Sequence, residues 1–237
     1  MTMGIDRFAD PLYTASEAGR YLGVPVETMR RWARSATVPP TDMSDTGSQP
    51  VITTLPSQRG HAAIPFVGLA EAYTLRALRA AGVPLQRIRP ALANLDKELG
   101  LRHALAAQRL YTDGAEVLYD FASVTADADL ASAAKELVVV RHGQRVFTPV
   151  VEDWLSQVSY ADGYAQVLPL PGYSDAEVVV DAGRGFGQPI FSHGGARVQD
   201  ALTMFDAGEH LEVVAEEFGV PETQLEEALR VALRRVA

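Results

Sequence analysis

The tripeptide Gly-Val-Pro occurs three times in this chain, at residues 23–25, 82–84 and 219–221. Each copy lies between two segments of helical periodicity. Glycine adopts the left-handed conformation that ends one helix, and proline fits the first turn of the next. The repeat therefore predicts three helix-turn-helix corners, so that paired short helices supply much of the fold.

The charge that follows these corners changes along the chain. Arginines follow the first two copies and glutamates follow the third. In chain order these residues are Arg30, Arg31 and Arg34; Arg87 and Arg89; and Glu222, Glu226 and Glu227. A polyanion is attracted to the first two helices and repelled by the start of the third. We infer that the N-terminal part of the chain binds nucleic acid and that the C-terminal part binds a different partner.

The overall composition supports this division. Residues 1–110 carry 13 basic and 9 acidic side chains, a net charge of +4, and the remaining residues carry 8 and 21, a net charge of -13. Such asymmetry indicates an anionic partner at one end. The chain has no cysteine, which excludes disulfides, thiolate catalysis and cysteine-based zinc sites. No apolar run approaches the roughly 18 residues of a membrane span, and no leader opens the chain, so we expect a cytoplasmic protein.

The first corner has the features of a DNA-reading unit. Thr14 and Glu17 have the spacing of a capping box at the start of a helix. In the second helix, expected over residues 25–35, Met29 and Trp32 face inward. The outer arc then carries Thr28, Arg30, Arg31 and Arg34. This pattern is typical of a recognition helix in the major groove, where arginine binds guanine edges or phosphate. The alternative is a packing corner with a solvated arginine face.

Residues 37–65 are rich in Pro, Ser, Thr and Gly and contain one β-prone piece, Val51–Leu55, followed by Arg59-Gly60-His61. A strand pair here would form a wing whose tip reaches the adjacent phosphates. The alternative is a disordered linker, because residues 41–49 are polar.

Residues 13–32, the expected wing and residues 66–89 resemble the winged-helix DNA-binding half of MerR-like regulators. The resemblance implies that the second helix pair packs on the first and adds phosphate contacts, with Arg59 and His61 as weaker candidates. MerR-like regulators dimerise through a long helix in the region that follows, which implies a homodimer. That region contains a seam at Leu85, Ile88, Leu92, Leu95 and Leu99. The seam indicates either a dimer contact or an ordinary buried face, and Pro90 predicts a kink or break near residues 88–89.

The middle of the chain predicts a small mixed sheet with one or two helices. The dipeptide Asp113-Gly114 favours a hairpin between its flanking segments. A buried strand is expected to precede the turn at residues 141–144, and the Pro171-Gly172 turn to connect two further strands. The segments are a hairpin of 108–112 and 116–121, a strand at 137–140, a helix at 150–158, and strands at 164–170 and 177–181.

Catalytic and metal sites are not indicated. Gly183–Gly187 follows a strand, but the extended pattern after it does not open a helix, as a dinucleotide-binding loop requires. The histidines lack the i, i+3 or i+4 spacing of metal ligands, and no serine lies in a nucleophile elbow. The five histidines are His61, His103, His142, His193 and His210. We expect no enzyme, no metal and no cofactor.

The back of the chain predicts three helices, over residues 199–205, 211–218 and 221–235, around a compact apolar core. This segment resembles a small antitoxin domain long catalogued as a domain of unknown function, through Gly187–Ile190, Arg197-Val198 and Gly208-Glu209. The order of a MerR-like N-terminal region followed by this C-terminal segment resembles VapB-type antitoxins of mycobacterial kind. The resemblance implies a PIN-domain ribonuclease toxin as partner, with Mg²⁺ held by a carboxylate cluster.

An arginine placed among those carboxylates would block such a toxin. The toxin-binding candidates are Arg230, Arg234, Arg235 and Glu226. Cations near a helix C-terminus also favour the helix dipole, which is the alternative explanation for these arginines. In a further alternative, the glutamates of the last two helices face a basic RNA-binding groove of the toxin.

We therefore predict an α+β, mainly helical protein with three regions. They are a winged helix-turn-helix DNA-binding region over 1–105, a small α+β connecting region over 106–180, and a helical antitoxin-like domain over 181–237. The predicted function is an antitoxin that neutralises a PIN-domain toxin and binds its own operator. The rival is a stand-alone regulator whose C-terminal half binds an effector or closes an oligomer, and a weaker third class is a nucleic-acid-processing enzyme.

Overall fold

The computed structural model describes residues 5–34, 50–58, 60–82, 102–124, 128–135, 137–141 and 144–233. The predicted α+β class is confirmed, with a helix-turn-helix near the N-terminus and two small sheets. Strands in both described sheets pair antiparallel, whereas the sequence led us to expect a mixed sheet.

The first corner forms as predicted. Helix α1 (Ala15–Tyr21) begins with a complete capping box, in which the Thr14 hydroxyl accepts from the Glu17 amide at 3.1 Å and the Glu17 carboxylate accepts from the Thr14 amide at 2.9 Å. Gly23, at φ 61°, turns the chain into α2 (Val26–Ala33). Helix α2 is shorter than expected because Arg34 is already extended.

Helix α3 (Phe66–Ala80) is buried on nearly all sides and forms the centre of the N-terminal region. The strand pair that was one of two alternatives for this region does not form at residues 51–55, since residues 50–58 contain no strand. Here the Thr53 amide donates to the Glu71 carboxylate of α3, which draws this segment onto the helix and out of a strand ladder. The second corner is described only to Gly82, at φ 89°; the leucine seam, Arg87, Arg89 and Pro90 lie outside the described residues.

The hairpin predicted around Asp113-Gly114 is wrong, because residues 108–124 form one helix, α5 (Gln108–Val124), after a short 3₁₀ turn, η1 (Ala104–Ala106). Apolar residues at helical spacing explain this outcome. Leu110, Ala115, Leu118 and Ala122 are all buried and form one stripe along α5. Helix α6 (Ala128–Lys135) follows and packs against α5.

The central strands confirm much of the predicted pattern. Strands at 137–140, 164–170 and 177–181 and a helix at 150–158 all have counterparts. Val140, however, is 67% exposed, so the first strand is not buried as expected. One sheet has four strands in the order β3-β4-β5-β6, and the other is the two-stranded hairpin of β1 and β2. The elements are β1 (Val138–Arg141), β2 (Gln144–Phe147), α7 (Pro149–Ser156), β3 (Ser159–Ala161), β4 (Tyr164–Pro169), η2 (Pro171–Ala176), β5 (Val178–Asp181), η3 (Gly185–Gly187) and β6 (Ile190–Phe191).

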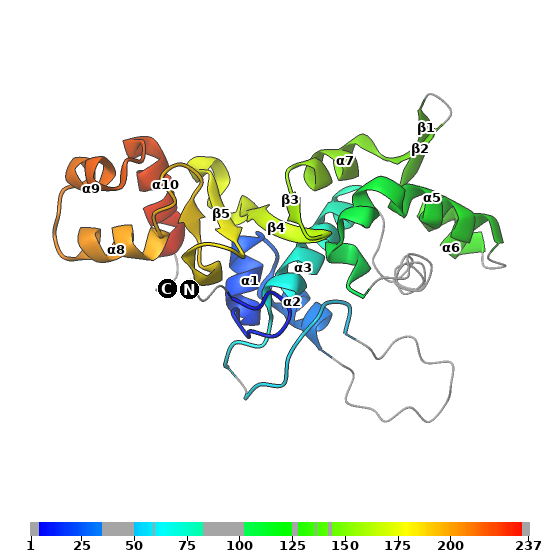
Figure 1. Ribbon diagram of the computed structural model, residues 1–237, viewed down its shortest axis with the longest axis horizontal. Coiled ribbons are helices and arrows are strands. Elements are labelled where there is room, and N and C mark those ends of the chain that lie inside the picture. Colours follow the sequence, from blue (N-terminus) through cyan, green and yellow to red (C-terminus); the bar gives the residue numbers. More distant parts are fainter. Residues whose placement is uncertain are drawn as a thin grey trace.

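The three predicted C-terminal helices are confirmed as α8 (Val198–Asp206), α9 (Leu211–Phe218) and α10 (Glu222–Leu233), with Gly219 at φ 62° in the third corner. Figure 1 shows them at one end of the molecule, α5 to α7 with the β1–β2 hairpin at the other, and the four-stranded sheet with α1 to α3 between. In the described part of the chain, no helix is both long and apolar enough to span a membrane.

Candidate nucleic-acid interface

The outer face of α2 is rich in arginine because its inner face is fixed in the core. Met29 and Trp32 are 0% and 2% exposed, and the Arg79 guanidinium lies 6.0 Å from the Trp32 ring. This packing fixes the rotation of α2 about its own axis. The opposite face therefore carries the predicted DNA-binding residues of α2, with Thr28 half-buried and Arg30, Arg31 and Arg34 exposed.

A groove of about 560 Å³ opens between the start of α1, the end of α2 and residues 54–64. It brings together three of the predicted DNA-binding residues, Arg30, Arg34 and His61, from segments that are separate in the sequence. Thr28 and Arg31 do not line this groove, and Arg59 lies outside the described residues. The structure thus unites the end of the expected recognition helix with the loop expected to be a wing.

The loop beside the groove is held without a strand pair. The Leu55 amide donates to the Ala63 carbonyl at 2.7 Å, and the His61 amide donates to the Gln58 carbonyl at 3.0 Å. Gly60 supplies the left-handed turn between them, at φ 88°. These bonds place the exposed His61 side chain at the groove.

The polar character of the groove suits an anionic ligand. The described residues that line it include two arginines and none that is acidic. Glu27 forms an ion pair with Arg30, but both side chains are largely exposed, so the pair is weak and exchangeable. Sequence reasoning missed three neutral polar side chains of the lining, Ser16, Ser57 and Gln58, because single hydroxyl and amide side chains carry no pattern. Arginines with neutral donors are the side chains that hold DNA phosphates.

A buried polar cluster of Thr53, Glu71 and His103 lies at the base of the loop. The Glu71 side chain is 6% exposed and accepts from the Thr53 hydroxyl at 3.0 Å, and His103 Nδ1 lies 3.0 Å from the same carboxylate oxygen. Thr53 precedes the loop, Glu71 belongs to α3, and His103 precedes η1. The cluster therefore ties the base of the loop to two other segments.

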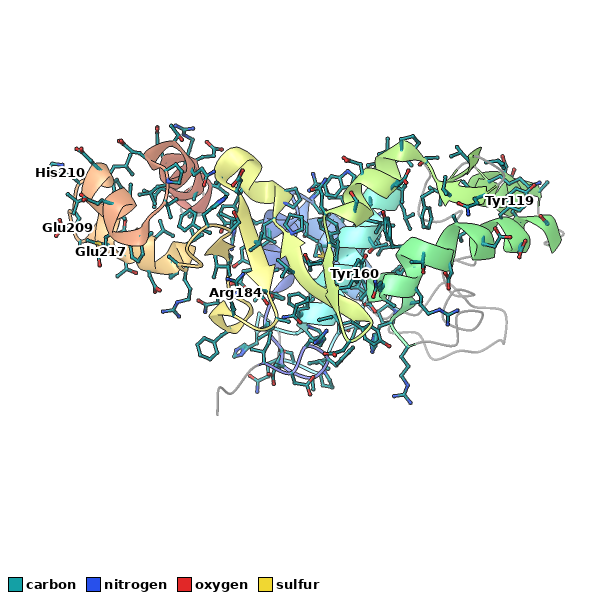
Figure 2. The ribbon with its side chains drawn as sticks, turned by 45° about the horizontal axis from the view of Figure 1, so that its top comes forward. Tyr119, Tyr160, Arg184, Glu209, His210 and Glu217 are labelled. Carbon is teal, nitrogen blue, oxygen red and sulfur yellow. The ribbon has the colours of Figure 1, made fainter. Side chains whose placement is uncertain are left out.

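Two of the predicted toxin-binding residues, Glu226 and Arg230, belong to α10, and neither lines this groove. Arg230 is half-exposed and pairs with both Glu226 and Glu227, each at 2.6 Å. Arg234 and Arg235 lie outside the described residues. Figure 2 labels Glu209, His210 and Glu217 at this end of the molecule, opposite Tyr119 of α5.

Helices α9 and α10 carry several exposed glutamates, and Val213 of α9 is 44% exposed. The exposed glutamates are Glu212, Glu216, Glu217, Glu222 and Glu226. Among the described residues, no group of three histidine or carboxylate side chains is arranged to hold a metal ion.

Comparison with known proteins shows which proteins the chain is similar to. Residues 11–92 match a protein family described as "Putative DNA-binding HTH domain". The chain is 49% identical over 228 residues to a Mycobacterium tuberculosis protein named "Putative antitoxin VapB45", with 94% of each chain covered. It is 25% identical over 235 residues to "Uncharacterized protein Rv2308" of the same organism, covering 92% of this chain and 88% of that one. The crystal structure of Rv2018 from M. tuberculosis matches with a TM-score of 0.80 and 48% identity, covering 94% of this chain and 100% of that one.

Proposed function

The chain belongs to the same family as VapB45 of Mycobacterium tuberculosis, and we propose that it neutralises a PIN-domain ribonuclease toxin and binds its own operator DNA to repress transcription. The DNA-binding half of this proposal is supported by one observation above all. Arg30, Arg34 and His61 line a single groove in which none of the described lining residues is acidic. We also propose that two copies bind together, so that two α2 helices meet half-sites about one DNA turn apart.

The operator proposal is tested with the DNA upstream of the gene. Changing Arg30, Arg31 and Arg34 to Ala removes the charge of α2 without touching Met29 or Trp32, so the fold is retained. We expect specific binding to be lost, and the salt dependence of residual binding to fall by about one unit of slope for each phosphate contact removed.

The matched control is Arg109→Ala. Arg109 is an exposed, ion-paired arginine like Arg30, but it lies on α5 away from the groove. It should bind operator DNA as the unchanged protein does. If the triple variant keeps its operator affinity, α2 is not the recognition helix.

For the toxin, we propose that the end of α10 enters the carboxylate cluster of the nuclease. Arg230 would then exchange Glu226 and Glu227 for toxin carboxylates. Exposed ion pairs of this kind are worth only about 0–1 kcal/mol each, so the exchange costs little. In the alternative version, the exposed glutamates of α9 and α10 bind a basic RNA-binding surface of the toxin.

Both versions are tested by co-purifying the chain with the nuclease encoded beside its gene and measuring RNA cleavage. One variant reverses the charge of Arg230, Arg234 and Arg235, and a second reverses that of Glu212, Glu216 and Glu217. Loss of inhibition in one variant assigns the contact to that group of residues. If cleavage stays fully inhibited with both variants, the C-terminal module is not the inhibitory surface.

A second candidate function is a stand-alone regulator that responds to an effector. It is favoured by a separate pocket of about 250 Å³ between α1 and the C-terminal module, lined in part by Tyr13, Tyr21, Tyr173, Gln188 and Gln199. A small molecule there would contact both the DNA-binding corner and α8. This function requires a ligand-dependent change in operator affinity, which a metabolite screen by fluorescence anisotropy measures directly.

A further inference from the structure

A third surface lies apart from both proposed sites, on the lobe formed by α5, α6, α7 and the β1–β2 hairpin (Figure 1). Here an open groove of about 670 Å³ runs between α5 and α7. Its lining residues are Tyr111, Pro149, Val150, Glu152, Asp153 and Ser156. Neither the DNA-binding groove nor the C-terminal module shares any of them.

The floor of this groove is apolar, although the core does not require it to be. Tyr111 is 39% exposed and Val150 is 45% exposed, whereas their neighbours Leu110 and Val151 are 1% and 0% exposed. Each helix thus packs through the neighbouring residue and turns a second large apolar side chain toward solvent. Exposed apolar residues gathered in one groove are a sign of a binding surface.

The rim of the groove is acidic. Asp153 belongs to the lining and is exposed. Residues 111–180 as a whole hold 11 acidic and 3 basic side chains. The field at the groove therefore attracts cations and repels anions, which excludes nucleic acid as its ligand.

The same charge argues against a symmetric contact between two copies. In a two-fold dimer the same patch faces itself, and because the charged side chains of the lining are all acidic, acidic side chains would face acidic side chains. Like charges across an interface disfavour association. The occupant must instead bring positive charge together with apolar side chains.

We propose that the groove between α5 and α7 binds a basic amphipathic segment of another protein. The apolar side chains of that segment pack on Tyr111 and Val150, and its lysines or arginines pair with Asp153. Short helical segments bind other proteins in this way, with apolar anchors at i, i+3 and i+4.

The probe is a fluorescently labelled Leu/Lys peptide of about 18 residues, long enough to form an amphipathic helix. It is titrated with the full chain and followed by anisotropy. A peptide of the same composition with its periodicity scrambled and a Leu/Glu peptide serve as comparisons. We expect the Leu/Lys peptide to bind most tightly, and Tyr111→Ser with Val150→Ser to weaken it at least about tenfold, as for loss of an interface anchor.

The single variant Asp153→Lys keeps both apolar residues and should also weaken binding. Its effect should shrink at high salt, since exposed charges are screened there. Because it leaves the groove floor intact, it tests the proposal even if the double variant does not fold. Unchanged operator binding and circular dichroism show that each variant is folded.

The matched control is Val213→Ser on α9. Val213 is an equally exposed valine among glutamates, but it lies outside any groove described for this chain. It should leave peptide affinity unchanged. If it weakens binding as much as the groove variants do, the peptide adsorbs to any acidic face and the proposal is wrong. Self-association of the unchanged chain that the groove variants abolish would also overturn the proposal, since the occupant would then be a second copy.

Discussion

At the scale of single residues, the Tyr13 hydroxyl links the N-terminal corner to a turn 174 positions later in the chain. It donates to the Gly187 carbonyl at 2.6 Å, and burial raises the pKa of this phenol well above its ordinary value. Tyr13→Phe removes the donor and leaves a buried carbonyl without it. We expect the free energy of unfolding to fall by about 1–3 kcal/mol, measured by chemical denaturation.

Tyr164→Phe is the control for this prediction. Its hydroxyl also donates to a backbone carbonyl, that of Arg102 at 3.0 Å, but the bond is exposed and water can replace the donor. Its loss should cost less than about 0.5 kcal/mol. Equal effects of the two substitutions would mean that the Tyr13 bond contributes no more than a surface one.

Asp181 makes stability depend on pH. Burial raises the pKa of its carboxyl, but hydrogen bonds donated by Arg184, Gly183 and Gln166 outweigh burial, so the pKa lies below its ordinary value. A lowered folded-state pKa stabilises the protein above the unfolded-state pKa, and this contribution is lost as pH falls through the folded-state value.

Asp181→Asn should therefore lower the free energy of unfolding by about 1–3 kcal/mol at neutral pH, as for a buried charged hydrogen bond. The difference from the unchanged protein should narrow only below about pH 4, where the carboxyl takes up a proton. Asp113→Asn, which removes an exposed i, i+4 pair with Arg109, should cost no more than about 0.5 kcal/mol at any pH. A difference for Asp181→Asn that narrows near pH 7 would contradict this assignment.

The residues that sequence reasoning found and missed differ in a physical way. Met29 and Trp32 follow from helical periodicity, so the exposed arginines of α2 follow too. Glu71 and His103 do not, because they are 32 positions apart and meet only in the folded chain. A carboxylate within the apolar first part of α3 was the one available signal, since a buried charge needs partners.

At the scale of elements, glycine misled the sequence analysis once. Asp113-Gly114 favours a hairpin turn, yet it lies within α5. There the glycine is required for its small size: a Cβ at position 114 would lie 2.8 Å from Leu110 Cδ1 and 3.1 Å from Phe147 Cζ. The turn propensity of two residues was outweighed by the burial of the apolar stripe of α5. By contrast, the glycines at 23, 82 and 219 all have positive φ and end helices or turns as predicted.

Gly114→Ala measures the balance between helix propensity and overpacking at position 114. Helix propensity alone would stabilise the variant by about 1 kcal/mol, but overpacking costs about 1–3 kcal/mol. We expect a net loss of stability in chemical denaturation. In the background of Leu110→Val, which lacks the obstructing Cδ1, the same substitution should cost less, giving a favourable coupling energy in a double-mutant cycle. A stabilised single variant would show that α5 shifts freely on its neighbours.

At the scale of the whole molecule, charge asymmetry along the sequence indicated separate binding surfaces in the N-terminal and C-terminal parts. The arginines of α2 and the glutamates of α9 indeed lie on different parts of the fold (Figures 1 and 2). The contacts that join those parts were not predictable. The Tyr13–Gly187 bond spans 174 positions, and α10 packs on η2. Neither contact leaves a local pattern in the sequence.

These contacts bear on whether the proposed regions 1–105, 106–180 and 181–237 unfold separately. Buried residues from Tyr13 to Ala232 form one continuous cluster. Trp154 of α7 packs on α3, with its ring 5.2 Å from the Tyr73 ring and 4.4 Å from the Arg76 guanidinium, across the first boundary. A shared core favours a single cooperative transition.

The two tryptophans supply the test. Trp32→Phe leaves only Trp154 as a fluorescent probe, and Trp154→Phe leaves only Trp32. Each variant is unfolded with denaturant while fluorescence and far-ultraviolet circular dichroism are recorded on the same samples. Because the core is continuous, we expect the two signals to change at the same denaturant concentration in each variant. If the Trp32 signal is lost before or after the helical signal, the helix-turn-helix is a separate folding unit, and the boundary proposed near residue 105 separates two units that unfold independently.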